Sequence, residues 1–380
     1  MYNYLDPETF FQILLVNRTG DSNNFMDQMF YPLHGDGYDA YRKEVNSVIS
    51  KRGLEGNNNI VRDRFITFGL HSSDPQAVRQ KLSRLETDTA QQFKAMGSNL
   101  HLLSGEQRLE VISSLLKPDE PFDFTYDELP ISGRSTKDFV CPPSFDFKPV
   151  RMFHFGDKIG QILYASKFPD TLSDEVLCDI SDLPINLAIS LHVQAEDQNK
   201  ALDYVRKQIA FMDQEASDKQ SKASTKGYAA QISLSQEFQY NYEKALQLVH
   251  NMQYKDQHLF RATLLVFTYA ETEDESKKNA EQICAIARQK GVTLSTLDYE
   301  QEYGMNSILP LGPNFVQHKR TMTTAAVSIF MPFMAVELLE PGGINYGINS
   351  RSNALIAFDR TKMRASNGMI LGTPGSGKWI

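Results

Sequence analysis

Cysteine is scarce in this chain of 380 residues, which has only Cys141, Cys178 and Cys284. They lie far apart without a C-x-x-C pair, and an odd number in a chain this long argues against a disulfide framework. The chain also lacks a leader with a basic start and an apolar core. Its longest uncharged run, 321–336, is shorter than the roughly 20 apolar residues that span a membrane. We therefore expect a protein of the reducing cytoplasm that reaches a membrane only through partners.

Runs of basic residues are missing as well. The formal net charge is -8, and no Lys/Arg cluster predicts a surface that follows a phosphate backbone, so no direct nucleic-acid site is expected. The eight histidines show no H-E-x-x-H or other ligand spacing, so no metal site is predicted and they are taken as ordinary surface or core groups. In HGDGYDAYR, Gly35 and Gly37 have no third glycine, and this segment is predicted to be a turn.

Three segments share a pattern in which an alternating apolar strand leads into an amphipathic helix. The strands are predicted over 65–70, 185–193 and 263–269. After the first strand, Ser73 is the predicted helix N-cap, and Pro75 lies just inside the helix, where its missing N–H does no harm. After the third, Gly291 ends the helix and 292–297 returns as a strand, which is typical of a βαβ or split βαβ, ferredoxin-like unit. The predicted fold class is α+β, with helices on one face of the sheets.

Other stretches depart from this pattern. Six prolines in 117–149 are expected to break any regular element there, which predicts a connector. A polar helical stretch over 196–252 is interrupted by Gly227, which predicts a helical hairpin that stands off the sheet. Its apolar positions after the break either pack the two helices together or form a partner-binding face. These positions are Leu234, Phe238, Leu246 and Val249. No regular helix is predicted over 320–333, whereas a β-hairpin is predicted from strands 344–348 and 354–358.

One motif near the end of the chain carries chemistry. The run Gly372-Thr373-Pro374-Gly375-Ser376-Gly377-Lys378 matches the G-x-x-x-x-G-K core of a phosphate-binding loop and follows an apolar strand stub. Its glycines allow positive φ, so that successive N–H groups form a nest for anionic oxygens. The lysine would place a cation against the β- and γ-phosphates.

This loop departs from the full pattern at its end. Trp379 stands where a Ser or Thr hydroxyl helps to hold Mg²⁺, and an indole has no oxygen to offer. Ile380 is the last residue, so neither the following helix nor an acidic Mg²⁺-holding strand is present in this sequence. We therefore expect no ATP turnover by this chain, and expect it to bind neither ATP nor Mg²⁺ tightly.

Six stretches, taken in order, resemble the conjugal-transfer ATPases of type IV secretion systems. The nearest resemblance is to the branch carried by Gram-positive integrative and conjugative elements, and the ordered set covers nearly the whole chain. The stretches are MFYPLHGDGYDAYRKEVN, NNNIVRDRFITFGLH, TKDFVCPPSFDF, LSDEVLCDISDLPINLAISLHVQ, QEYGMNSILPLGPN and NGMILGTPGSGK. As an ordered set they are far more specific than the loop alone.

The resemblance implies an N-terminal αβ assembly domain followed by a RecA-like P-loop motor domain. Such a protein works as an oligomer, a hexamer in the intact family, at the cytoplasmic face of the membrane, docks on secretion-channel components, and uses ATP and Mg²⁺. The implied domains are 1–116 (first αβ subdomain), 117–150 (connector), 151–312 (second αβ subdomain with the helical hairpin) and 313–380 (start of the RecA-like domain). The resemblance also implies additional sequence before the YNYLDPETFFQILLVNRTGD region and a motor domain after the loop.

What carries over residue by residue is limited. Phosphate contacts carry over to Gly372, Gly375, Gly377 and Lys378, while Mg²⁺ binding does not. Two other readings stay open beside the assembly part of a conjugation motor. One is a separate, non-catalytic interaction module that regulates or competes with the full motor, and the other is a weak nucleotide binder without hydrolysis.

Overall fold

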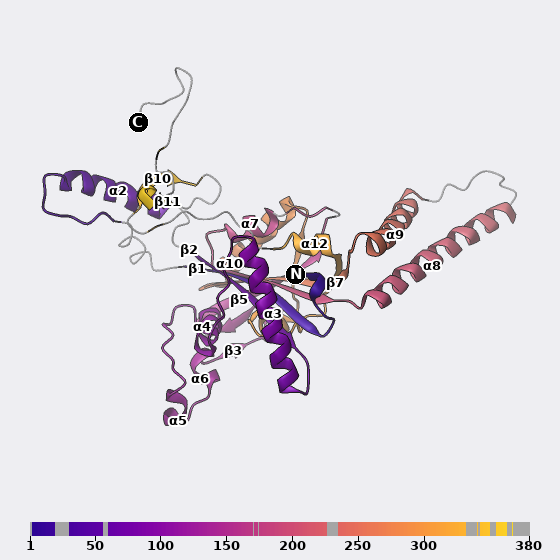
Figure 1. Cartoon of the computed structure of the whole chain (residues 1–380), viewed down its shortest axis with the longest axis horizontal. Helices are drawn as coiled ribbons and strands as arrows, with labels where there is room; N and C mark the ends of the chain where they lie inside the picture. Colours follow the sequence, from indigo (N-terminus) through magenta and orange to yellow (C-terminus); the bar gives the residue numbers. More distant parts are fainter. Residues whose placement is uncertain are drawn as a thin grey trace, which may run out of the picture. The chain divides into compact units, whose positions relative to one another are not determined.

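A computed structural model (Figure 1) describes most of the chain and shows a mixed α+β fold with an antiparallel sheet, as the sequence predicts. The described residues are 2–19, 30–55, 60–169, 171–173, 175–225, 235–331, 340, 343–349, 355–362 and 367. The chain forms two compact units. The first unit, which we call the sheet unit, consists of Met1–Asn17 and Arg62–Pro332. The second consists of Arg18–Val61 and Phe333–Ile380. We call it the α2–hairpin unit, after helix α2 (Asp39–Glu55) and the β-hairpin near the end of the chain.

The sheet unit is built on a nine-stranded sheet in which the strands run in the order β2-β1-β6-β7-β5-β4-β3, with β8 paired to β5 and β9 to β7. Its strands are β1 (Thr9–Thr19), β2 (Ile60–Leu70), β3 (Phe145–Asp146), β4 (Phe153–Phe155), β5 (Lys158–Lys167), β6 (Leu187–Ala195), β7 (Leu259–Ala270), β8 (Thr293–Thr296) and β9 (Arg320–Thr323). Strands from 1–116 and from 151–312 therefore share one sheet, because β1 pairs with β6 along seven residues from Phe11↔Val193 to Asn17↔Leu187.

The centre of the sheet consists of two interlocked split βαβ units. Strands β5 and β6 both pair antiparallel to β7, so they run parallel to each other with β7 between them, and α7 (Glu175–Ser181) lies in their connection. Likewise β7 and β8 both pair antiparallel to β5, and α10 (Glu273–Gln289) connects them. Gly291, at φ 78°, follows α10 and lets the chain turn into β8. The predicted strand–helix–strand unit is confirmed in its split form.

Both faces of the central strands are buried, whereas the sequence predicted helices on one face only. Successive side chains of a strand point to opposite faces, yet Leu265, Val266 and Phe267 are each 1% exposed or less. Phe267 belongs to the core cluster that includes residues of α4 (Gly105–Leu116) and α11 (Gln301–Ile308). The opposite face of β7 packs against α10. The one-face prediction is wrong because helices from separate parts of the chain cover each side.

The helix after β2 begins one residue later than the predicted cap. In α3 (Pro75–Ala95) the N-cap is Asp74, whose side chain accepts hydrogen bonds from the backbone N–H groups of Gln76 and Ala77. The predicted cap, Ser73, is therefore wrong, while Pro75 is confirmed as the first helical residue. An aspartate directly before a proline at the first position supplies the acceptor where the free N–H groups begin.

The proline-rich connector contains short regular elements, so the prediction that its prolines exclude them is wrong. It forms α5 (Glu128–Ser132), α6 (Thr136–Val140) and β3. Pro130 is tolerated in α5 because it lies in the first turn, where a backbone N–H has no partner inside the helix. The segment also packs inward, since Val140 and Phe124 are both 6% exposed and belong to the buried core of the sheet unit.

The helical hairpin is confirmed as α8 (Gln198–Thr225) and α9 (Gln236–Tyr254), which extend away from the sheet in Figure 1. Only its base is packed, where Ala201 and Val205 form a small cluster with Leu259. Of the predicted apolar positions, Val249 packs onto this cluster, but Leu246 is 45% exposed and Leu234 lies outside the described residues. The stripe therefore divides between helix packing and open surface.

The last described segments confirm one prediction and correct another. Strands β10 (Ile344–Ile348) and β11 (Leu355–Phe358) pair antiparallel, as the predicted hairpin requires. The region 320–333, where no helix was predicted, forms β9 followed by α12 (Thr324–Ser328), whose N-cap Thr323 accepts from Ala326 N–H. The remaining elements are the short η1 (Tyr2–Tyr4) and η3 (Arg360–Lys362) and the helix α2 (Asp39–Glu55). Over the described part of the chain, the length and apolar character that a membrane-crossing helix needs are not met by any helix.

Candidate functional site

The predicted phosphate-binding residues Gly372, Thr373, Pro374, Gly375, Ser376, Gly377 and Lys378 lie outside the described residues, as do 369–371 and Trp379. The loop therefore stays a prediction from the sequence. The structure does describe the β10–β11 hairpin that precedes it in the chain, together with the segment from the other end of the chain that shares its compact unit.

The α2–hairpin unit joins segments about 300 residues apart. Ile49 on α2 and Ala357 on β11, each 1% exposed, form its described core, and Phe30 and Tyr31 pack around them. The Tyr31 hydroxyl donates a hydrogen bond of 3.2 Å to the backbone oxygen of Gly343, beside β10. This pairing was not predicted from the sequence, which assigned the two segments to the first and last domains.

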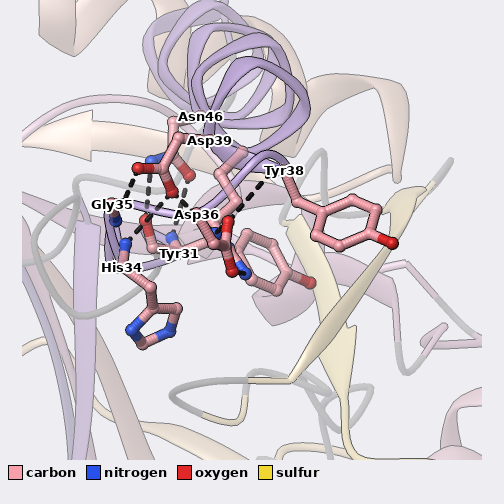
Figure 2. A network of polar contacts seen from close by, with 8 residues as sticks. Tyr31, His34, Gly35, Asp36, Tyr38, Asp39 and Asn46 are labelled. Atoms are coloured by element: carbon pink, nitrogen blue, oxygen red, sulfur yellow. Dashed lines mark hydrogen bonds and ion pairs between the residues drawn. The ribbon is translucent and has the colours of Figure 1, made fainter.

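A network of polar contacts holds the loop before α2 onto the helix (Figure 2). Asn46 binds both backbone groups of Tyr31: its Oδ1 accepts from the Tyr31 N–H at 2.8 Å, and its Nδ2 donates to the Tyr31 oxygen at 3.0 Å. Two turns earlier, the Asp39 carboxylate accepts from the backbone N–H groups of His34 at 3.1 Å and Gly35 at 2.7 Å. The loop is therefore fixed at both ends by side chains of α2.

The charged side chains of the same loop and of the first turn of α2 form ion pairs with one another. The Arg42 guanidinium donates to both Asp36 and Asp39, with 2.6 Å from Nη1 to the Asp39 Oδ1. The hydrogen bond from Arg42 lowers the pKa of Asp36 to about 2, helped by the backbone N–H of Tyr38. The pKa of Asp39 is lowered chiefly by the His34 backbone N–H, and that of Arg42 is raised chiefly by Asp36. Asp39, in the first turn of α2, also has the favourable sign for a helix N-terminus.

The turn predicted for HGDGYDAYR is confirmed over 34–38, whereas 39–42 already belong to α2. The structure adds why the turn holds its shape. The residues that fix it, Asp36, Asp39, Arg42 and Asn46, were not singled out from the sequence. A signal was present, because acidic residues just before and at the start of a helix and an arginine one turn on are typical of a capped helix start. With its donors and carboxylates engaged in one another, the loop orders this part of the unit.

A second polar cluster is buried in the sheet unit, where side chains of β1 and β6 meet the end of α11. The Gln12 side-chain nitrogen lies 3.0 Å from the Ser190 hydroxyl and within 3.2 Å of three backbone oxygens at the C-terminal end of α11. Its Oε1 accepts from the Gly312 N–H at 3.3 Å. One buried amide thus satisfies the free carbonyls of the helix end and fixes the turn that follows.

His192 completes this cluster. Its Nε2 lies 2.8 Å from the Ser307 oxygen and 3.1 Å from the Ser190 hydroxyl. Burial lowers the pKa of His192 to about 4, with the Ser307 backbone offsetting part of the effect, so the imidazole is neutral near pH 7. The ring borders a cavity of about 30 Å³, also lined by Phe10, Arg261 and Lys319. That volume holds about one or two water molecules and excludes a nucleotide. His192 is a core histidine, in line with one of the two predicted roles.

Within the described ranges, His, Cys, Asp and Glu side chains form no group of three or more that could hold a metal ion. None of the three cysteines, all half-buried, forms a disulfide. Comparison with protein-family models gives no match, and comparison with curated proteins gives none either.

Proposed function

We propose that this chain is the assembly part of a conjugative DNA-transfer ATPase of a type IV secretion system. In this role it docks on channel components and on its own copies at the cytoplasmic face of the membrane, to which it is held through partners. The observation that carries the proposal is the ordered set of six family-like stretches, which ends in the glycine-rich loop 372–378.

The architecture of the sheet unit supports an assembly role. The strand order β8-β5-β7-β6 and the connections through α7 and α10 correspond to the ferredoxin-like topology that the strand–helix–strand pattern of the sequence predicts. The α8–α9 hairpin is inserted between β6 and β7, and no described residue of α9 is fully buried. A protruding helix pair with exposed side chains such as Tyr204, Phe211 and Tyr254 is suited to contact other proteins.

The segment 313–380, which contains the β10–β11 hairpin, is proposed as the start of the RecA-like motor domain, with the glycine-rich loop as its nucleotide site. Two features support placing the nucleotide there. The cavity beside His192 is too small for a nucleotide, and the loop 31–39 has its carboxylates and arginine engaged with one another. The backbone nest and Lys378 are then the groups of this chain suited to bind β- and γ-phosphates.

The loop favours binding over hydrolysis. A nest of glycine N–H groups and one lysine can hold phosphate oxygens, but turnover also needs a hydroxyl for Mg²⁺ and a residue that positions water. Trp379 has no oxygen to replace that hydroxyl. ATP and Mg²⁺ are therefore proposed as cofactors of the intact motor, with the weak binder that does not hydrolyse ATP as the second candidate function for this chain.

A titration with fluorescent ATP, followed by an assay for phosphate release with and without Mg²⁺, tests the proposed site. We expect weak binding that is lost in Lys378→Ala and kept in Lys362→Ala, a lysine outside the loop that lies 3.6 Å from Glu340 and is 64% exposed. We expect no phosphate release. Binding that is unchanged in Lys378→Ala would remove the nucleotide site, and Mg²⁺-dependent release that this variant abolishes would show a working motor.

A further inference from the structure

We propose that the outer side of α2 is a self-association surface that packs antiparallel against α2 of a second copy of this chain. This inference does not depend on the proposed ATPase family. It rests on the side chains that α2 leaves exposed and on the charges beside them.

Buried and exposed apolar residues lie next to each other around the helix. Ile49 is buried against β11. Beside it, Tyr38, Tyr41, Val45 and Val48 face outward and are 68%, 66%, 40% and 41% exposed. Their spacing of three, four and three residues is that of the a and d positions of a helix that pairs with another helix. We call these four residues the outer stripe.

The outer stripe is held in place before any partner binds. The Tyr38 oxygen accepts from the Arg42 N–H at 3.2 Å, so Tyr38 continues the first turn of α2. Its own N–H donates to Asp36 at 2.9 Å, and Asp36 and Asp39 are both bound by Arg42. Figure 2 shows the Tyr38 ring pointing away from this network. A preorganised aromatic surface loses little conformational entropy on binding.

The charges beside the stripe identify a second copy as the occupant. Glu44 and Lys51 stand seven residues apart on one flank of the stripe, in the position that precedes each a residue. They are too far apart to pair within one helix, where partners lie three or four residues apart. In an antiparallel pair with Val45 opposite Val48, Glu44 of each copy faces Lys51 of the other. The flank is thus complementary to itself, as a two-fold interface requires.

The opposite flank of the stripe explains why the partner approaches from one side. On that flank, Arg42 and Ile49 follow the d positions Tyr41 and Val48. Arg42 already binds the loop, and Ile49 already packs on the hairpin of the same chain. The second helix therefore lies toward Glu44 and Lys51. The contact is small, so we expect a weak dimer, with a Kd of about 10–100 µM.

Sedimentation equilibrium of the full 380-residue chain, at low and high salt, tests the proposal. We expect a monomer–dimer equilibrium that Val48→Asp abolishes. Glu44→Lys and Lys51→Glu should each weaken the dimer about tenfold, because each sets like charges opposite each other twice. The double variant Glu44→Lys/Lys51→Glu should restore the wild-type Kd. Lys43→Glu, an exposed residue at an outward-facing position, is the matched control and should leave the Kd within about twofold.

The rescue separates this proposal from a merely structural role of the two residues. Because the pair cannot meet within one helix, the double variant can recover only through contacts between copies. A chain that stays monomeric at about 100 µM or above would overturn the proposal. So would a dimer that the α2 variants do not affect, or single reversals that the double variant fails to rescue.

Discussion

The two units of this protein differ in how much they bury. The sheet unit has a continuous core on both faces of β7, in which Phe153, Phe155 and Phe267 stack with ring centroids 5.5–6.0 Å apart. The described core of the α2–hairpin unit has two buried residues, Ile49 and Ala357, and is otherwise held by polar contacts. Apolar burial is the main source of stability, so the sheet unit should govern global unfolding, while the second unit opens locally.

This difference indicates separate tasks. A well-packed sheet is a rigid platform that can carry the α8–α9 hairpin, whereas a small unit held by Asn46, Asp39 and Arg42 can be ordered further by a partner. The predictions below test whether the two units respond separately.

The largest effect is expected in the core of the sheet unit. Phe267→Ala removes a fully buried ring from the stack with Phe153 and should lower the free energy of unfolding by about 3–5 kcal/mol, through lost burial and the cavity left behind. Urea unfolding followed by circular dichroism measures this loss. A change below about 1 kcal/mol would mean that the sheet does not govern the global transition.

The matched change in the other unit is Ile49→Ala. It should speed amide hydrogen exchange in β10 and β11 while leaving β6 and β7 unchanged, because Ile49 packs on β11 and belongs to the smaller core. Faster exchange in β6 as well would show that the two units are coupled more tightly than their separate cores suggest.

The next effect is expected in the pH dependence of the free energy of unfolding of the sheet unit. The folded pKa of His192, about 4, lies below its ordinary value of 6.5, so the unfolded state binds the proton first as pH falls. The stability that neutral His192 contributes is therefore complete above pH 6.5 and is lost as pH falls from 6.5 to 4, by about 3 kcal/mol in all. His192→Gln should flatten the profile between pH 6.5 and 5, measured by urea unfolding at each pH. An equal slope in both proteins would contradict the burial of a neutral imidazole.

The smallest effect is expected in the loop before α2. The pKa of Asp36 is lowered to about 2 from 3.8, first by the hydrogen bond from Arg42, so the ordering it supports should be present above pH 3.8 and fade as pH falls toward 2. In Arg42→Gln the midpoint of Asp36 should rise toward 3.8. A carbon-detected NMR titration of the carboxyl group measures both values. An unchanged midpoint in the variant would show that Arg42 is not the main cause.

Local pattern was enough to predict much of the fold. The strands 65–70, 185–193 and 263–269, the helical hairpin and the β10–β11 hairpin all follow from alternation, helical spacing and turn residues, and all are confirmed in place. The predictions were wrong where contacts with other parts of the fold outweighed the local propensity of the residues. The proline-rich segment forms α6 because Val140 is buried there in the core of the sheet unit. Helix α12 directly follows β9, which pairs with β7.

The candidate site divides in the same way. The phosphate-binding loop 372–378 is predicted from glycine spacing and one lysine, since its chemistry would depend on backbone N–H groups that neighbouring residues in the chain present. The clusters around Gln12 and Asn46 could not be found in this way, because Gln12 reaches residues of α11 almost 300 positions away and Tyr31 reaches Gly343. Single polar residues of this kind look ordinary until folding brings their partners near.

The sequence by itself determined the elements, their mixed α+β character and the presence of a glycine-rich loop, because periodicity and turn chemistry act over a few residues. Only the tertiary structure decided that β1 to β9 join in one sheet, and that Arg18–Val61 folds with Phe333–Ile380. It also decided which side of α2 is left open. The reason is that strand pairing and burial depend on contacts between residues far apart in the chain, which local patterns do not encode.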